Sequence, residues 1–263
     1  MSFRLLSVGV AWALVLAAGV RADPPFDQTH AALDRVLRQH VRDGRVDYAA
    51  LKASPKPLAE YLDQLAEVTA ESFKTWSEPD RLAFLINLYN AATLQLIVDN
   101  YPVTSIKRIG SWFGFVGAGS GPWAQKVVRL FGQVTTLDQV EHGIIRKEYR
   151  DARIHFALVC AARGCPPIRA EAWVGAKLDG QLTEQGRIFL SETEKNRLDP
   201  AARILYLSPI FKWFAADFEA QAGSVEKFIL PLWPDAVRLS LSESGYKIVY
   251  TTYDWSLNEV TGR

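Results

Sequence analysis

The sequence predicts a single α+β domain, in which about seven helices surround a modest, mainly antiparallel sheet. Two patterns lead to this class. Many apolar residues recur at helical spacing, and a smaller number of short segments have the composition or alternation of strands. The chain has no internal repeat, and no linker is long enough to divide it into separate domains.

The first 22 residues are expected to be a secretory signal peptide outside the fold. Arg4 gives a short positive start, residues 5–20 are apolar apart from Ser7, and Val20-Arg21-Ala22 resembles a cleavage site. An uncleaved membrane anchor is the alternative, although the apolar run is short for a span. We therefore expect a periplasmic or secreted domain over residues 23–263, with no transmembrane segment after signal removal.

The charge of the chain gives no electrostatic basis for binding nucleic acid. Its 30 Lys and Arg are balanced by 29 Asp and Glu, and no basic block is present. An apolar content of 49% is sufficient for a real core. The 2 cysteines are an even number, and in an oxidising compartment they form at most one disulfide.

The N-terminal part of the domain is predicted to be mainly helical. Asp27 begins a helix with an apolar stripe from Ala31 to Val41. The polar face of this helix is rich in Arg and Asp, so His30 and His40 are expected in solvent. Gly44 ends the helix. The next elements expected are a short strand over residues 45–48 and a helix over residues 58–68.

The longest predicted helix runs from Ser77 to about Asn100. Ser77, with Asp80 three residues later, is a strong helix start. The helix is apolar almost all round, which is typical of a central, buried helix. Asn87 and Asn90 are polar exceptions that either bond to backbone or line a binding site. The structural role is the one that this pattern favours.

A glycine-rich segment over residues 110–122 carries several aromatic residues, among them Trp112. It lacks the Gly-Lys-Ser/Thr ending of a phosphate loop and the flanking elements of a dinucleotide fingerprint. A packed connection is one interpretation, and a lid or wall over a pocket is the other.

The second half of the chain alternates between short strands and capped helices. Thr136 with Gln139 is a capping box, and the helix that it starts carries Glu141 and His142. The elements expected, in order, are a hairpin (126–130 and 133–135), a helix (137–149), a strand (153–159), a helical region after Trp173, a strand (203–207), helices after Ser208 and Ser224, and a strand (246–253).

The segment 151–169 is the most informative part of the sequence. It holds both cysteines, Cys160 and Cys165, together with His155. The predicted strand 153–159 runs into a loop of small residues that ends at two prolines. A strand that ends in a loop carrying thiols is a common place for chemistry and also for a structural disulfide.

Six motifs follow one another along the chain: INLYNAATLQLI (86–97), YPVTSI (101–106), TLDQVEHGIIR (136–146), RIHFALVCAARGCPPIR (153–169), LSPIFKWFAADF (207–218) and YDWSLN (253–258). Together they resemble the DUF547 family, a domain of unknown function. The resemblance covers roughly residues 70–260 and implies family membership without an established activity. Plant relatives carry the domain behind a coiled coil, which implies an interaction role there, and that region is absent here. The position of Cys160 matches the family pattern more widely than that of Cys165.

One hypothesis is a cofactor-independent, thiol-dependent hydrolase or acyl transferase. Cys160 or Cys165 is then the nucleophile and His155 the base, because a thiol needs a base or a lowered pKa to attack. Asn87 and Asn90 are candidates to stabilise an oxyanion. The carboxylate that orients the imidazole is assigned to Glu141 or Asp254, with Asp217 a further candidate.

The alternative hypothesis is a non-catalytic binding or envelope-associated domain stapled by a disulfide. Trp112 and Trp255 then contribute to the surface for a small-molecule or peptide ligand, although Trp213 and Trp255 also have the pattern of core residues. His155 is structural in this interpretation. The two hypotheses are nearly balanced on the sequence.

Other chemistries are less favoured. The Cys-x4-Cys spacing is not that of thioredoxin-like enzymes. His155 and the two cysteines, with His142 or Glu141, have the residue types of a zinc site but not the spacing of a known one. No metal or cofactor is therefore expected, and no glycosidase-type carboxylate pair is evident.

Overall fold

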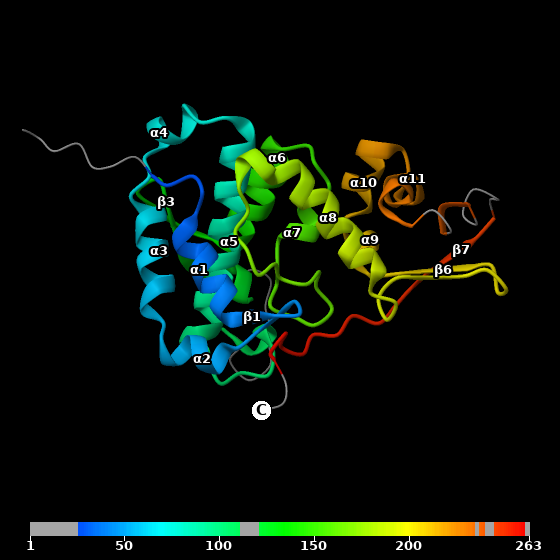
Figure 1. Cartoon of the computed structure of the whole chain (residues 1–263), viewed down its shortest axis with the longest axis horizontal. Coiled ribbons are helices and arrows are strands. Elements are labelled where there is room, and N and C mark those ends of the chain that lie inside the picture. Colours follow the sequence, from blue (N-terminus) through cyan, green and yellow to red (C-terminus); the bar gives the residue numbers. More distant parts are fainter. Residues whose placement is uncertain (1–25, 111–120, 235–236, 240–244, 261–263) are drawn as a thin grey trace, which may run out of the picture.

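The computed structural model describes residues 26–110, 121–234, 237–239 and 245–260, and it is an α+β fold (Figure 1). The N-terminal signal-peptide prediction and Trp112 lie outside these residues. The α-helices are α1 (Ala31–His40), α2 (Tyr48–Ala53), α3 (Lys56–Ala66), α4 (Ala70–Lys74), α5 (Glu78–Asn100), α6 (Arg146–Glu148), α7 (Ile154–Ala157), α8 (Leu178–Ser191), α9 (Ile210–Trp213), α10 (Ala215–Ala222) and α11 (Val225–Ile229). A π-helix, Gln139–Ile145, leads into α6.

Strands form three small sheets in the described part of the chain. Two are antiparallel hairpins, and in the second the turn at Phe131-Gly132 has positive φ at both residues, as a tight hairpin turn requires. The third sheet has the order β5-β6-β7, antiparallel and then parallel. The strands are β1 (Val41–Arg42), β2 (Arg45–Val46), β3 (Lys126–Leu130), β4 (Gln133–Thr136), β5 (Arg197–Asp199), β6 (Ile204–Leu207) and β7 (Lys247–Tyr250).

Helix α5 is the central element, as the sequence predicts. The Ser77 hydroxyl accepts from the backbone N–H of Asp80, which caps the helix. Nearly every position from Leu82 to Val98 is buried. By length and composition α5 is able to cross a membrane, but 89% of its apolar window is buried inside the protein, as in the core helix of a soluble protein.

Two hydrophobic clusters make up the core, and α7 contributes to both. Ile154 and Ala157 belong to the larger cluster around α1, α3 and α5. Phe156 belongs to the smaller cluster around α8 to α11 and the third sheet. Figure 1 shows α1, α3 and α5 on one side of α7, and α10, α11 and the third sheet on the other. His155, on the same turn, therefore lies where the two clusters meet.

The prediction of a strand over residues 153–159 is wrong. The chain forms the single helical turn α7 and becomes extended only from Leu158. Its side chains are buried in every direction, so the apolar run has no alternation that distinguishes strand from helix. Asn90 binds the backbone where the turn ends: its Nδ2 donates to Ala157 O (2.9 Å), and its Oδ1 accepts from Val159 N (3.0 Å).

The N-terminal histidines are also not where the sequence pattern placed them. His30 and His40 are 2% and 5% exposed. His30 Nδ1 lies 2.8 Å from the Tyr61 hydroxyl on α3, which satisfies one polar atom of the buried ring. The strand expected over residues 45–48 covers only Arg45–Val46, because Tyr48 begins α2.

The C-terminal segment after β7 crosses from the second cluster to the first (Figure 1). Its backbone pairs with the loop that carries the cysteines: Arg163 N donates to Ser256 O and Gly164 N to Asp254 O, both at 2.8 Å. It then joins β2, where Val46 N donates to Asn258 O at 2.9 Å. The last described residues are thereby held against the first hairpin.

Candidate functional site

A pocket of about 220 Å³ lies where the two clusters and the C-terminal segment meet. It contains His155 and both cysteines, the three residues that the sequence singles out. Side chains come from α5, the π-helix, α7, the cysteine loop, α9 and the C-terminal segment. The lining residues are Tyr89, Trp123, Asp138, Glu141, His142, His155, Leu158, Cys160, Cys165, Ile210, Trp213, Phe214, Tyr253 and Trp255.

Cys160 and Cys165 form a disulfide in one wall of this pocket. The Cys160 backbone N–H donates to Cys165 Sγ at 3.0 Å. The Tyr253 hydroxyl donates to Cys165 Sγ at 3.1 Å and lies 3.0 Å from Cys160 Sγ. In this state neither sulfur is a thiolate, so neither is a nucleophile or a metal ligand.

Glycine at position 164 allows the tyrosine to reach the disulfide. A Cβ at Gly164 would lie 2.9 Å from the ring of Tyr253, closer than real contacts allow. The same glycine donates its N–H to Asp254 O, next to the tyrosine. The loop and the C-terminal segment therefore position Tyr253 together.

His155 is held by a carboxylate on α10. Its Nε2 lies 2.7 Å from Asp217 Oδ2, and its ring stacks on Phe214 with centroids 3.8 Å apart. Arg146 donates to both oxygens of Asp217, at 2.7 and 3.0 Å. These contacts form a continuous array from the surface at Arg146 to the buried imidazole, whose side chain is 1% exposed.

The protonation states of this array follow from its surroundings. Burial lowers the pKa of His155, so the imidazole is neutral at neutral pH. The hydrogen bond from His155 and those from Arg146 hold the pKa of Asp217 well below its usual range. His155 therefore donates its Nε2 proton to an ionised carboxylate, and Nδ1 is the ring nitrogen that remains to accept a proton.

Aromatic rings form the rim of the pocket. Trp255 stacks on Trp213 with centroids 5.9 Å apart and meets Trp123 edge-on at 6.0 Å. Tyr253 lies within 4.7 Å of Trp213 and 4.6 Å of Trp255, measured between ring centroids. The Trp213 side chain is 49% exposed. A large aromatic side chain this exposed is typical of a surface that binds a ligand or another protein.

Three of the other candidate residues lie away from the pocket or are bound to backbone. Asp254 is exposed and closes a turn with Ser256, so it does not face His155. Asn87 bonds to the Trp173 backbone through both its amide nitrogen (2.7 Å) and its oxygen (3.0 Å). Asn90 clamps the end of α7, as described above.

The pocket brings together five of the residues expected in the site, namely His155, Cys160, Cys165, Glu141 and Trp255. Asp217, weighed from the sequence as a further candidate, is the carboxylate that bonds to His155. Trp213 has the spacing of a core residue, and its exposure could not be read from the pattern. Among the described residues, no three His, Cys, Asp or Glu side chains are grouped to hold a metal ion.

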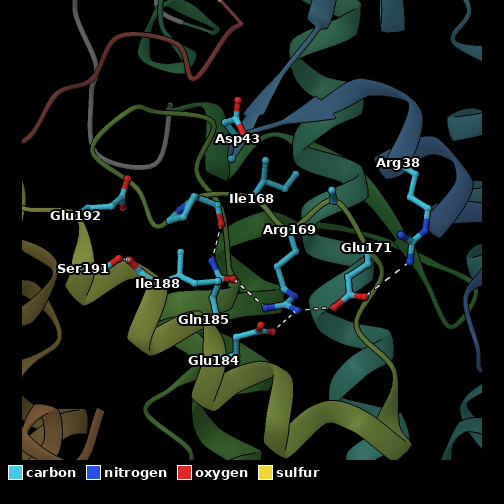
Figure 2. Close-up of a pocket in the computed structure, with 13 residues that line it drawn as sticks. Arg38, Asp43, Ile168, Arg169, Glu171, Glu184, Gln185, Ile188, Ser191 and Glu192 are labelled. Carbon is cyan, nitrogen blue, oxygen red and sulfur yellow. Dashed lines mark hydrogen bonds and ion pairs between the residues drawn. The ribbon is translucent and has the colours of Figure 1, made fainter. Parts of the chain in front are cut away.

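A larger groove of about 630 Å³ lies between α1 and α8, and its two arginines pair with its glutamates Glu171 and Glu184. Figure 2 shows Arg169 in its centre, bonded to Glu171, to Glu184 (2.6 Å) and to Gln185 (3.3 Å). Gln185 in turn donates to Pro167 O at 2.6 Å. This network ties the loop after the cysteines to α8, which is a structural role.

Comparison with known proteins identifies a family. Residues 73–190 match the family DUF547, described as a protein of unknown function. This part of the chain belongs to the DUF547 family. No curated protein and no solved structure matches the chain. The DUF547 region is shorter than the span of the six motifs. It includes His155 and the disulfide, whereas Trp213, Tyr253 and Trp255 lie beyond it.

Proposed function

We propose that this DUF547 protein is an exported, non-catalytic binding domain whose ligand occupies the pocket beside the Cys160–Cys165 disulfide. The single observation that carries the proposal is the exposed Trp213 at the rim of an aromatic pocket that a disulfide closes on one side. Pockets for small molecules combine apolar and aromatic walls with a few polar groups, and this lining has that composition.

The disulfide favours binding over thiol catalysis. A thiol enzyme needs a free thiolate, whereas both sulfurs are bonded to each other and contacted by Tyr253. The bond keeps the cysteine loop in one conformation, which places Tyr253 against Trp213 and Trp255. A preorganised wall of this kind lowers the entropic cost of binding a ligand.

Export is part of the proposal. Disulfides persist in oxidising compartments, and the apolar segment 5–20 with its cleavage pattern would direct the chain there. A periplasmic or secreted location would also keep the pocket in its oxidised form.

A ligand-observed NMR screen of small metabolites against the oxidised protein tests the proposal. Trp213→Ala should abolish binding of the hits without unfolding the protein, because half of this side chain is in solvent. Tyr250→Ala is the matched control, since Tyr250 is 37% exposed on β7 and does not line the pocket. A screen without hits, or hits that bind Trp213→Ala unchanged, would contradict the proposal.

A thiol-dependent hydrolase or acyl transferase is the second candidate, favoured by one observation. His155, oriented by Asp217 at 2.7 Å, lines the same pocket as both sulfurs. This is the base-and-orienting-carboxylate arrangement of nucleophilic enzymes. Under this proposal the reduced protein is the active form, with Cys160 or Cys165 as nucleophile and Nδ1 of His155 as base.

Alkylation of the protein purified without reductant separates the two candidates. Binding predicts that both cysteines react only after reduction. The enzyme predicts that the reduced protein hydrolyses activated esters, such as p-nitrophenyl acetate, and that Cys160→Ser, Cys165→Ser or His155→Gln removes this activity. Equal ester hydrolysis by the reduced protein and all three variants would eliminate the enzyme.

A further inference from the structure

We propose that the pocket selects a small organic cation, an amine or a quaternary ammonium group on an apolar body. This inference rests on the proposed binding function and specifies its ligand. It follows from two properties of the described lining residues, two carboxylates with no lysine or arginine among them and a group of electron-rich rings.

The charge of the lining is negative. Glu141 and Asp138 line the pocket, and the described residues that line it include no lysine or arginine.

Glu141 is the better placed of the two carboxylates, because its side chain is only 12% exposed. Its neighbour His142 has Nδ1 3.9 Å away, but the same nitrogen lies 3.2 Å from the Arg146 guanidinium. His142 Nδ1 therefore lies closer to Arg146 than to Glu141, and its 3.9 Å contact with Glu141 is longer than a hydrogen bond.

Arg146 attracts Glu141 through its charge, but this cation is shared with a second carboxylate. Arg146 is bonded to both oxygens of Asp217. His155 is uncharged at neutral pH, since burial lowers its pKa. Tyr89 is a neutral phenol, because burial and the charge of Glu141 raise its pKa well above the usual value. A positively charged ligand would supply the missing counter-charge in a place that water reaches poorly.

The rings around this carboxylate suit the same ligand. Trp123, Trp213, Trp255 and Tyr253 present indole and phenol π-systems, which attract cations through their faces. One of them already holds an ammonium group: Lys107 Nζ lies 4.6 Å from the Trp255 ring centroid. The described residues that line the pocket offer an anion two carboxylates and no lysine or arginine, so the lining disfavours an anion. A neutral sugar-like ligand is the alternative that an experiment must separate.

Three ligands of the same size and different charge provide the test. Phenethylamine, 2-phenylethanol and 3-phenylpropionate are titrated into the oxidised protein at pH 7 by isothermal calorimetry. We expect the amine to bind about tenfold more tightly than the alcohol, and the propionate not to bind. Equal affinities for amine and alcohol, or no binding by the amine, would overturn the inference.

A matched pair of variants assigns the preference to Glu141. Glu141→Gln keeps the shape of the side chain and removes its charge, so the ratio of amine to alcohol affinity should fall towards one. Glu148→Gln makes the same change at an exposed position on α6 and should leave the ratio unchanged. An unchanged ratio in Glu141→Gln would also overturn the inference. The binding function is tested separately, by the metabolite screen. If that screen gives hits of any charge but the amine is not preferred, the binding function stands and only the cation preference fails.

Discussion

His155 and Asp217 are 62 residues apart in the sequence, and their side chains are joined by a 2.7 Å contact between Nε2 and Oδ2. The contact connects α7 to α10 across the junction of the two hydrophobic clusters. Arg146, at the end of the π-helix, bonds to the same carboxylate, so Asp217 also connects the π-helix to α10. Asp217 is thus the point at which three segments around the pocket are held together.

Replacing Asp217 by Asn should destabilise the protein by about 2 kcal/mol. The amide keeps one acceptor but loses the charge that both Arg146 and the buried imidazole use. The free energy of unfolding from urea titration measures the change. Glu219→Gln, an exposed position on the same helix, should change it by less than about 0.5 kcal/mol. Equal effects of the two substitutions would show that the array contributes nothing to stability.

Acid should destabilise the protein through its buried histidines. Burial lowers the pKa of His30 to about 4 from its ordinary value of 6.5. The unfolded chain therefore binds a proton at His30 below pH 6.5, while the folded chain does so only near pH 4. His30 alone should reduce the free energy of unfolding by about 3 kcal/mol as the pH falls through this window. The lowered pKa values of His155 and His40 act in the same direction.

Urea titrations between pH 4 and pH 8 isolate the contribution of His30. His30→Gln removes the titrating group and retains a hydrogen-bonding side chain near Tyr61. The difference in stability between wild type and variant should shift in favour of the variant as the pH falls. A difference that stays constant from pH 8 to pH 4 would mean that His30 is not protonated differently in the two states.

Loss of the disulfide should lower stability by about 2 kcal/mol, the entropy of closing so short a loop. The double variant Cys160→Ser/Cys165→Ser and the reduced wild type should unfold at similar urea concentrations. Adding reductant to the double variant, which has no disulfide, is the control for effects of the reductant that do not act through the bond. If reduction leaves the stability of wild type unchanged, the bond is absent from the purified protein or does not constrain the unfolded chain.

Asn90→Ala should cost about 3 kcal/mol, because it removes two buried hydrogen bonds and leaves Ala157 O and Val159 N without these partners. Asn100→Ala lies at the exposed end of the same helix and should have a small effect. Thermal unfolding followed by circular dichroism compares the two. A similar melting temperature for both variants would show that the clamp on α7 is dispensable.

Much of the fold follows from local signals in the sequence. Ser77, Pro79 and the apolar run to Asn100 predict α5 with its observed bounds, because capping and burial act within the helix itself. The second hairpin is predicted by its Phe131-Gly132 turn for the same reason. The Cys160–Cys165 bond was one of two alternatives that the sequence left open, since spacing does not reveal oxidation state.

What the sequence could not predict depends on contacts between distant segments. The strand expected over 153–159 is a helical turn, because both clusters surround it and none of the described strands pairs with it. Asp217 could not be preferred to Glu141 or Asp254, because only the packing of α10 against α7 brings it to His155. The exposure of Trp213 likewise depends on where the C-terminal segment runs.

The proposed ligand lies in the pocket between the disulfide and the rings of Trp213 and Trp255. A crystal structure of the oxidised protein with the tightest ligand from the metabolite screen tests it most directly. We expect electron density for the ligand against these rings, with Cys160 and Cys165 still bonded to each other. Density for the ligand only elsewhere, for example in the groove around Arg169, would contradict it.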